Sequence, residues 1–427
     1  MKEEGSSEGI EAEGLFLFTW ERQCIRALDK SLTLLIRSGR ILMESGAEIY
    51  RVEETIVRLG KALHLKEVQS YCTPTGLFIG YTHDEEPRTA VRRVFKRAIN
   101  LRRISEVNDL ARQFSQGKMS VESALLQLEN IEKQKEPYPW YWQIFCISLV
   151  AAILALLNGG KGLEFAVALL VSGLLRFFMF KSKFFMNTPF LREFALGAFG
   201  MVLVLLTKTM LDVQMVPIMI GLLLSAFPGA YMVNSVRDIV AGDLLAGAIR
   251  GLEATGLTVA LFGGAGMVLA TLGNGYIEEV TTKASHGFAM EMLFGFMIAA
   301  FFSMALNTPH NTVLASGLAG LIGRSVLVLT ILLGSTPIMG MFWGTLAVVI
   351  LSEIMARYYK VPVTLFVIGG IIPLLPGLFF FQATYTLVQG DYVRLIEPFV
   401  QGAMGIISIG AAAAAITGLV RFWKTSR

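Results

Sequence analysis

The segment PGAYMVNSVRDIVAGD at residues 228–243 returns later in the chain as PGLFFFQATYTLVQGD at residues 376–391. Both copies begin with a Pro-Gly pair and end with a Gly-Asp pair, and the offset of 148 residues is the same at both ends. Each Pro-Gly pair lies in a long apolar stretch, where proline removes a helical hydrogen bond and interrupts the helix. The pattern therefore predicts two related halves, each with one broken apolar helix. The simpler alternative is that Pro-Gly only kinks each helix and Gly-Asp only turns the chain.

The composition indicates that these halves lie in a membrane. The 427 residues are 54% hydrophobic and only 16% charged, and the mean hydropathy is +0.59. This balance excludes the disordered and fibrous classes. A net charge of +4 is too small to indicate nucleic-acid binding, and Cys24, Cys72 and Cys146 show no CxxC spacing. We expect no disulfide framework, no metal site and no cofactor.

Ten apolar segments follow Trp142, each long enough at about 1.5 Å per residue to cross a hydrocarbon core of roughly 30 Å. Their approximate ranges are 143–157, 163–180, 190–207, 213–233, 245–272, 287–305, 313–333, 338–356, 363–381 and 398–421. The expected fold is an α-helical polytopic membrane protein with ten transmembrane helices. They form a 5+5 inverted repeat, because an odd number of crossings inverts the second copy. The predicted halves are residues 141–273 and 287–427, joined by an external linker at residues 274–286.

The amino-terminal third has no apolar run of spanning length. We predict a disordered acidic tail at residues 1–20, with no signal peptide, and a soluble cytoplasmic domain at residues 21–140. Basic and acidic residues balance here, with 21 of each before residue 141. The periodicity predicts mainly helices, a short β segment between Gln69 and Thr82, and a further helix from Thr89. A group at helical spacing is predicted to form a salt-bridged surface: Glu48, Arg51 and Glu53.

The positions of lysine and arginine predict the orientation, because cytoplasmic loops retain an excess of positive charge. With the amino terminus inside, the cytoplasmic side collects Arg176, Lys181, Lys183, Arg192, Arg237, Arg250, Arg357, Lys360, Arg421, Lys424 and Arg427. The outside then holds Lys161, Lys208, Lys283, Arg324 and Arg394. Ten crossings return the carboxyl terminus to the cytoplasmic side. The expected location is the cell inner membrane, with both termini in the cytoplasm.

Broken helices at matching places in two inverted halves are typical of secondary transporters, whose helix ends and carbonyl groups face a solute near the midplane. We expect a substrate-binding or gating site around the two repeats. Its candidate residues are Pro228, Gly229, Asn234, Arg237, Asp238, Gly242, Asp243, Pro376, Gly377, Gln382, Gly390 and Asp391. Asp243 is the predicted inner gate residue and Asp391 the outer one. The alternative for the charged connection after Val233 is an ordinary solvated loop.

Ionisable side chains inside the apolar half are costly and so are functional candidates. Glu291 and Glu353 are the candidates for carrying a coupling proton, and Arg324 interrupts a long apolar segment. The alternative for each is snorkelling to the membrane interface. An intramembrane aspartyl protease is disfavoured, because Asp243 and Asp391 are predicted on opposite sides. The soluble part has no GxSxG motif and no metal-spaced histidines, so we expect no enzyme and no catalytic residues.

Two sets of ordered motifs match a known family. In the amino-terminal domain they are Gly39, Ser45-Gly46-Ala47-Glu48, Tyr50-Arg51-Val52-Glu53, Thr89 with Arg92, and Val107-Asn108. In the membrane they are Phe227-Pro228-Gly229, Arg237-Asp238, Gly242-Asp243, Gly247, Arg250, Glu253-Ala254 and Pro373-Leu374-Leu375-Pro376-Gly377. After residue 30 the chain resembles the threonine/serine exporter family over nearly its whole length. The resemblance implies a fused, ten-helix inner-membrane antiporter that exports small hydrophilic metabolites, most simply threonine and serine, against protons.

The same resemblance leaves alternatives open. It extends to relatives split into two chains, which look like dicarboxylate exporters of succinate type. A membrane sensor whose soluble domain is the active part is another alternative, and so is a channel. The implied partners are a small-molecule substrate (an amino acid or a dicarboxylate), protons and the lipid bilayer, without nucleic acid. A homo-oligomer is left open.

Overall fold

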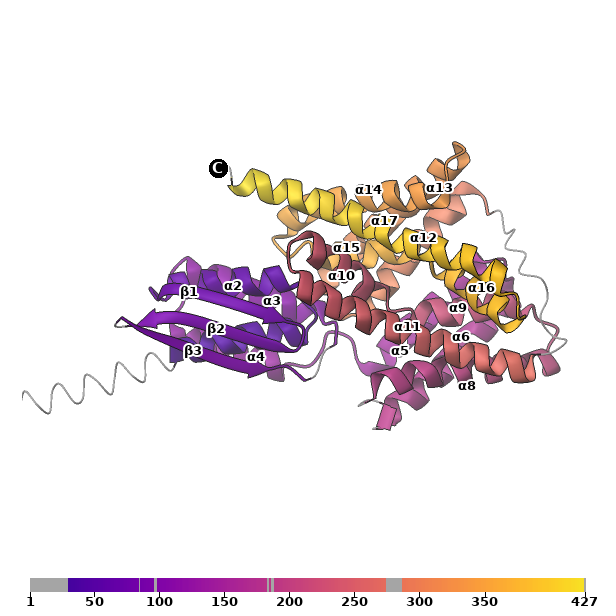
Figure 1. Ribbon diagram of the computed structural model, residues 1–427, viewed down its shortest axis with the longest axis horizontal. Coiled ribbons are helices and arrows are strands. Elements are labelled where there is room, and N and C mark those ends of the chain that lie inside the picture. Colours follow the sequence, from indigo (N-terminus) through magenta and orange to yellow (C-terminus); the bar gives the residue numbers. More distant parts are fainter. Residues whose placement is uncertain are drawn as a thin grey trace, which may run out of the picture. The chain divides into compact units, whose positions relative to one another are not determined.

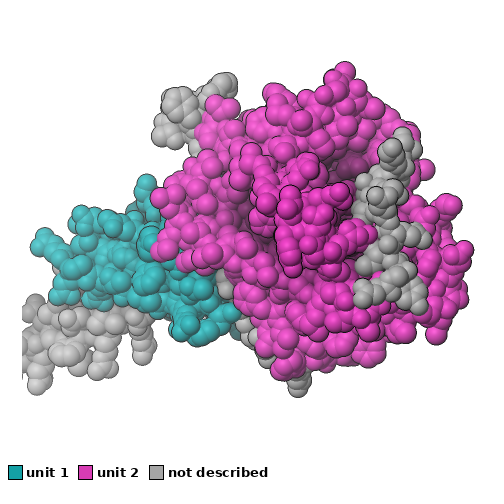
Figure 2. Space-filling model, turned by 45° about the vertical axis from the view of Figure 1, so that its right-hand side comes forward, with its two compact units in different colours: residues 1–99, 103–135 teal, residues 100–102, 136–427 magenta. Residues whose placement is uncertain are grey.

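The computed structural model describes residues 30–83, 85–95, 98–182, 184–185, 188–273 and 286–425. The predicted tail at residues 1–20 lies outside these ranges, as does the predicted linker at residues 274–286 except for its last residue. The chain divides into two compact units, one of residues 1–99 with 103–135 and one of residues 100–102 with 136–427 (Figure 2). Each unit is described by itself.

The amino-terminal unit combines helices with a small sheet (Figure 1). Residues 30–44 are helical, and the elements that follow are α2 (Ile49–Ala62), β1 (Lys66–Thr73), β2 (Gly76–His83), β3 (Glu86–Arg93), α3 (Leu101–Ser115) and α4 (Val121–Lys133). The three strands are antiparallel in the order β1-β2-β3. Helix α2 packs on β1, and Leu77 and Ile79 of β2 are fully buried. One face of the sheet is therefore part of the core of this unit.

Two sequence expectations change in this unit. The helix predicted from Thr89 to Phe114 is present but begins only at Leu101, because Thr89 lies in β3 and pairs with Gly80 of β2. A tight hairpin with β2 overrides the local helical pattern there. The predicted ion pair is present between Arg51 Nε and Glu48 Oε2 at 3.0 Å, but Glu48 is fully buried and does not form a surface. Burial lowers the pKa of Arg51, but Glu48, Tyr50 and Glu54 together outweigh it and raise the pKa above its ordinary value.

The second unit is helical throughout its described part (Figure 1). Its elements are α5 (Trp140–Leu157), α6 (Gly162–Lys181), α8 (Pro189–Met210), α9 (Met215–Ala226), α10 (Gly229–Val240), α11 (Leu244–Leu272), α12 (Phe288–Ala305), η1 (His310–Thr312), α13 (Val313–Leu332), α14 (Pro337–Tyr359), α15 (Thr364–Ile371), η2 (Ile372–Leu374), α16 (Gly377–Val388) and α17 (Tyr392–Thr425). Among the described residues, eight helices are long and apolar enough to span a membrane, or up to ten spans if two bent pairs are included. The expectation of a mainly helical, multi-pass chain with a short β segment is confirmed.

The two bent pairs contain the repeated Pro-Gly motifs. Helices α9 and α10 meet at 47°, and α15–η2 meets α16 at 42°. Pro228 and Pro376 have no N–H with which to continue the preceding helix, so a new helix starts at the following glycine. Both new helices are 12 residues long. The sequence therefore predicted both breaks at the residues where they occur.

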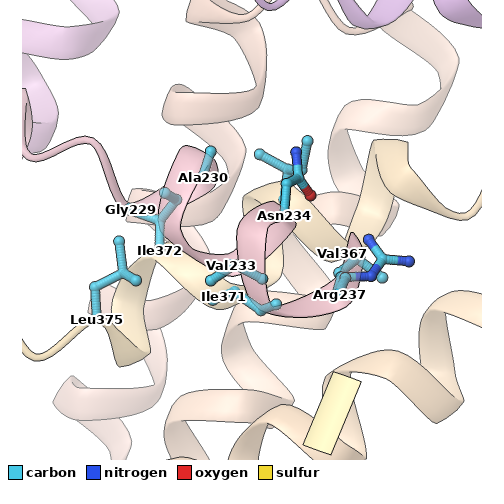
Figure 3. Close-up of a pocket in the computed structure, with 10 residues that line it drawn as sticks. Gly229, Ala230, Val233, Asn234, Arg237, Val367, Ile371, Ile372 and Leu375 are labelled. Carbon is cyan, nitrogen blue, oxygen red and sulfur yellow. The ribbon is translucent and has the colours of Figure 1, made fainter. Parts of the chain in front are cut away.

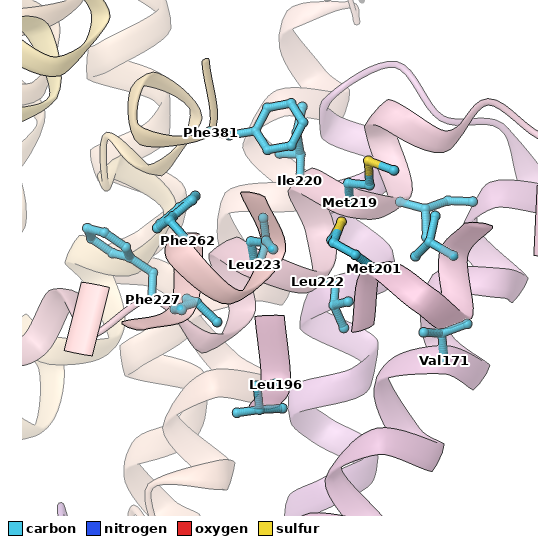
Figure 4. Close-up of a cluster of buried hydrophobic side chains, with 14 of the residues drawn as sticks. Val171, Leu196, Met201, Met219, Ile220, Leu222, Leu223, Phe227, Phe262 and Phe381 are labelled. Atoms are coloured by element: carbon cyan, nitrogen blue, oxygen red, sulfur yellow. The ribbon is translucent and has the colours of Figure 1, made fainter. Parts of the chain in front are cut away.

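One core of the second unit gathers apolar side chains from several helices. Figure 4 shows Val171 of α6, Leu196 of α8 and Phe227 close to Phe262 of α11, together with Phe381 from α16. Small residues bring the helices close together at other points. A Cβ on Gly221 of α9 would lie 2.3 Å from the carbonyl oxygen of Ala151 on α5. Close backbone approach through glycine is a usual way for membrane helices to pack.

Candidate functional site

A pocket lies between α10 and the segment formed by α15 and η2 (Figure 3). One wall comes from α10: Gly229, Ala230, Val233, Asn234 and Arg237. The other is apolar: Val367, Ile368, Ile371, Ile372 and Leu375. The pocket is tight, with room for about one water molecule.

The two helix breaks contact each other beside this pocket. A Cβ on Gly229 would lie 2.2 Å from Leu375, which comes just before the second Pro-Gly pair. Reciprocally, a Cβ on Gly377 of the second motif would lie 2.6 Å from Leu224, near the end of α9. A side chain at either glycine would push the two breaks apart. The glycines of both motifs therefore serve the close packing of one broken helix on the other.

The polar side chains of the pocket wall belong to a buried charged group on α10. Asn234, Arg237 and Asp238 are all buried, and Asp238 is 0% exposed. Asp238 Oδ2 lies 2.9 Å from Nη1 of Arg250, a buried residue of α11. A fully buried carboxylate is stable only when it is paired in this way. This pair ties the second half of the first broken helix to α11.

The interpretation of this group as a charged connection after Val233 is wrong. Asn234, Arg237 and Asp238 lie within α10, which continues to Val240. Hydropathy counts each charge as if it faced water, whereas here the carboxylate of Asp238 is neutralised by Arg250 inside the protein. The helix can therefore extend through a stretch that looks too polar to be buried.

The two predicted gate aspartates follow identical turns. Gly242 and Gly390 both have positive φ, +99° and +75°, which ends α10 and α16 in the left-handed conformation that glycine favours. The backbone N–H of Asp243 then donates to the backbone carbonyl oxygen of Asp238 at 2.9 Å. The N–H of Asp391 does the same to Thr386 at 3.1 Å. Each aspartate thus begins the next long helix, α11 or α17.

The two candidate proton carriers have different surroundings. Glu291, buried in the first turn of α12, accepts a hydrogen bond from Nε of Arg324 on α13 at 2.8 Å, and Nη2 of Arg324 forms an ion pair with the same carboxylate oxygen at 2.8 Å. Arg324 also donates through Nη1 to the carbonyl oxygen of Pro373 at 3.3 Å. Glu353 lies near the end of α14, is partly exposed, and makes no ion pair among the described residues. Only Glu291 belongs to a network that touches a broken helix.

The structure brings some predicted site residues together and separates others. Gly229, Asn234 and Arg237 line the pocket, with Pro228 and Asp238 next to them in the chain. Nine predicted residues do not line it: Pro228, Asp238, Gly242, Asp243, Pro376, Gly377, Gln382, Gly390 and Asp391. The apolar wall was missed, because nothing distinguishes it in sequence from other membrane-facing residues. In the described part of the chain, no three His, Cys, Asp or Glu side chains are grouped to hold a metal ion.

Two ionisable residues inside the membrane helices were also missed. Arg176, which the sequence only counted on the cytoplasmic side, lies within α6, and Glu193 is buried on α8 beside its partner Arg192. A signal was available for the first of them. Arg176 and Arg324 are 148 residues apart, which is the offset of the Pro-Gly repeat.

Comparison with protein families and with characterised proteins gives a consistent result. Residues 33–272, more than half of the chain, match a family described as a threonine/serine exporter (ThrE), and residues 291–419 match a second family described as "Threonine/Serine exporter, ThrE". The chain is 24% identical over 379 residues to a probable threonine/serine exporter of Mycobacterium tuberculosis. That match covers 85% of this chain and 71% of the relative. No solved structure matches.

Two further relatives are informative. The threonine/serine exporter of Corynebacterium glutamicum is 22% identical over 406 residues, which cover 91% of this chain and 80% of that protein. The probable succinate transporter subunit YjjP of Escherichia coli is 27% identical over 256 residues, which cover 56% of this chain and 94% of that protein. The chain is thus similar to both one-chain exporters and a subunit of shorter length.

Proposed function

The chain belongs to the threonine/serine exporter family, and we propose that it is a secondary active transporter that exports threonine and serine in exchange for protons. The family is one of transporters, which agrees with the expectation of a non-enzymatic protein. The observation that carries the proposal is the pocket between the two broken helices. Its polar groups, Asn234 and Arg237, stand in an otherwise apolar wall.

In this proposal the second unit is a 5+5 inverted repeat, residues 141–273 and 287–427. The bounds of the helices support it. Helix α5 (Trp140–Leu157) and α12 (Phe288–Ala305) have the same length and lie 148 residues apart at both ends. The same offset relates both ends of α10 and α16, and the starts of α8 and α14 and of α11 and α17. The break at Pro-Gly is therefore one part of a correspondence that runs through the whole membrane unit.

We place the amino-terminal domain (residues 21–140) and both termini in the cytoplasm. The support is the excess of lysine and arginine on that side, as expected from insertion into the inner membrane. The linker at residues 274–286 is then external. Five crossings in each half put Asp243 at the inner side and Asp391 at the outer side. We assign these two residues to the inner and outer gates.

The substrate site is proposed at the pocket wall of α10. Arg237 is the partner for the carboxylate of an amino acid, because a guanidinium can bind both carboxylate oxygens. Asn234 lies three residues earlier on the same face of the helix, where its amide can bond the substrate hydroxyl. Rocking of the two halves about Pro228-Gly229 and Pro376-Gly377 would alternate access to this site. Gln382 stands at the matching position of the other broken helix.

The coupling proton is proposed to act at Glu291, with Glu353 as the second candidate. Protonation of Glu291 would remove the negative charge that binds Arg324, and Arg324 contacts the segment before the second break. A change of charge at Glu291 would thus reach the broken helix through one residue. Glu353 has no such connection in the described residues.

A dicarboxylate of succinate type is the second candidate substrate. The match to the YjjP subunit over 94% of its length supports it. A dicarboxylate needs a cationic partner for each carboxylate, whereas the pocket wall offers Arg237 alone. The amino acid is therefore the better fit to the pocket.

The test is efflux of labelled threonine, serine or succinate from proteoliposomes of the full chain, with and without an imposed proton gradient. We expect gradient-stimulated efflux of threonine and serine. Asn234→Ala should weaken transport about tenfold, as the loss of a buried hydrogen bond predicts. The matched control is Gln382→Ala, which leaves the pocket wall intact. Efflux at the same rate with and without the gradient would indicate a channel. Efflux of succinate but not of threonine or serine would show that the substrate is a dicarboxylate.

A further inference from the structure

Two arginines lie inside the membrane helices at matching positions. Arg176 is on α6 and Arg324 on α13, 148 residues apart. Both are only partly accessible, and a guanidinium within a membrane helix is costly unless it has partners or a function. Two such residues at one repeat offset point to a shared role.

The contacts of the two arginines match as well. Arg176 Nη2 donates to Ser225 Oγ at 2.9 Å, and Arg324 Nη1 donates to the carbonyl oxygen of Pro373 at 3.3 Å. Ser225 and Pro373 are again 148 residues apart, and each lies three residues before a Pro-Gly pair. Each arginine therefore reaches the carboxyl-terminal end of the half-helix that precedes a break.

A positive charge stabilises the carboxyl-terminal end of a helix. Phe227 N–H bonds the Leu224 oxygen and Leu375 N–H bonds the Ile372 oxygen, but Pro228 and Pro376 have no N–H to offer the other last carbonyl groups of α9 and η2. The helix dipole also leaves partial negative charge there. A guanidinium from a neighbouring helix stabilises this end and fixes its position relative to α6 or α13.

The remaining partners differ between the halves. Arg324 is held by the carboxylate of Glu291, whereas the residue 148 positions before Glu291 is the uncharged Gln143. Arg176 bonds instead to Ser172 Oγ at 3.3 Å and makes no salt bridge within the described ranges. The charge of Arg324 is therefore balanced by a direct ion pair, whereas Arg176 is attracted at longer range by Glu193, which forms its ion pair with Arg192.

We propose that Arg176 and Arg324 are equivalent positioning residues, each of which holds one helix break closed, on opposite sides of the membrane. The proposal rests on the inverted repeat and alternating access proposed above. Arg176 lies toward the inner end of α6 and Arg324 toward the outer end of α13 in that topology. Loss of the Arg176 contact should loosen the inner side, and loss of the Arg324 contact the outer side. If the two arginines served stability alone, their loss would not raise accessibility on opposite sides of the membrane.

The experiment measures accessibility instead of transport, so it does not depend on the substrate. Single cysteines replace Asn234 and Gln382, which occupy matching positions in α10 and α16, in a chain whose Cys24, Cys72 and Cys146 are changed to serine. A membrane-impermeant maleimide is applied to inside-out or right-side-out vesicles without substrate. Arg176→Gln should raise the labelling of N234C from the cytoplasmic side about tenfold, as the loss of a charged hydrogen bond predicts. Arg324→Gln should raise the labelling of Q382C from the outside.

Two further variants keep the test decisive. Ser225→Ala removes the acceptor of Arg176 while leaving the arginine in place, and it should shift N234C labelling in the same direction as Arg176→Gln by a smaller factor. Arg357→Gln changes an exposed arginine near the end of α14 and should shift neither reporter. The proposal would be overturned if Arg176→Gln and Arg324→Gln raised labelling equally on one side of the membrane. It would also be overturned if a folded Ser225→Ala variant left the labelling of N234C unchanged. Opposite shifts in a protein that transports none of threonine, serine and succinate would keep this inference and refute only the proposed transport activity.

Discussion

The two broken helices have nearly the same backbone. The break bends α9 against α10 by 47° and α15–η2 against α16 by 42°. Pro228 has φ −78° and ψ 44°, and Pro376 has φ −79° and ψ 34°. Both second halves run for 12 residues and end at a glycine of positive φ. Proline, glycine and the left-handed turn are sufficient to explain this agreement, because they act on the backbone alone.

The side chains that the two helices bury are different. Asn234, Arg237 and Asp238 of α10 correspond in position to Gln382, Tyr385 and Thr386 of α16. The partner of Asp238 is Arg250, and the matching residue of the other half is Pro398 inside α17. The repeat therefore keeps the break and varies the charge. One half carries a buried ion pair and the polar pocket wall, and the other forms the neutral counterpart.

The largest effect is expected where the halves differ most. Asp238→Asn removes the charge that pairs with buried Arg250 and should lower the stability by about 3–5 kcal/mol, since a buried cation loses this carboxylate. Thr386→Ala, the matched control, removes a hydroxyl that bonds only within its own helix and should cost less than about 1 kcal/mol. Thermal unfolding in detergent measures both. The double variant Asp238→Asn/Arg250→Gln should recover part of the loss, and no recovery would contradict the ion-pair explanation.

A second, smaller effect concerns helix packing at matched glycines. Gly221 and Gly369 are 148 residues apart, and a Cβ at either would clash with a neighbouring helix, at 2.3 Å from the Ala151 carbonyl oxygen or 2.2 Å from Ser303 Oγ. Replacement by alanine should cost about 1–3 kcal/mol in each case. The obstacle at Gly369 is a side chain, so Ser303→Ala should rescue it.

No such rescue exists for Gly221, whose obstacle is backbone. Unfolding temperatures of Gly221→Ala, Gly369→Ala and Gly369→Ala/Ser303→Ala test the difference. If the double variant were as unstable as Gly369→Ala, the contact with Ser303 would not be the cause.

The third effect should be the same in both halves. Gly242 and Gly390 have positive φ, and a Cβ at either position would meet no other atom within 4 Å. Alanine should therefore cost only the strain of the left-handed backbone, about 1–2 kcal/mol at each site. Unfolding temperatures that fall by unequal amounts would show that the two turns are not equivalent.

Much of this architecture could be predicted from sequence because it depends on the backbone. Proline and glycine act through local geometry, so Pro228-Gly229 and Pro376-Gly377 identified both breaks. Apolar length alone indicated the membrane helices. Side chains whose role depends on a distant partner could not be placed in this way. Asp238 looked like part of a loop, because its partner Arg250 is on another helix.

The pocket residues also show that sequence alone does not place side chains whose role depends on a distant partner. Asn234 and Arg237 stand out as polar residues near a break, but Ile371 and Ile372 opposite them look like any membrane-facing residues. Their role depends on how the two broken helices pack, which hydropathy does not contain. Arg176 is a different case. Its match to Arg324 was present in the sequence, and extending the offset of 148 beyond the Pro-Gly motif would have found it.

The smallest effect is predicted for a substitution that makes the first half resemble the second. Gln143→Glu places a carboxylate at the position that matches Glu291, and it should couple to Arg176 as Glu291 does to Arg324. Gln143 now donates to the Tyr138 oxygen at 2.9 Å and to Asn307 Oδ1 at 3.3 Å. Gln143→Met, which also loses these bonds, is therefore the control. A double-mutant cycle of Gln143→Glu with Arg176→Gln in detergent should give a coupling of about 0.5–1 kcal/mol. The native Glu291–Arg324 pair should give more, because both of its partners are already aligned. A strong native coupling with none at the engineered pair would show that the two arginines share a helix position but not a geometry.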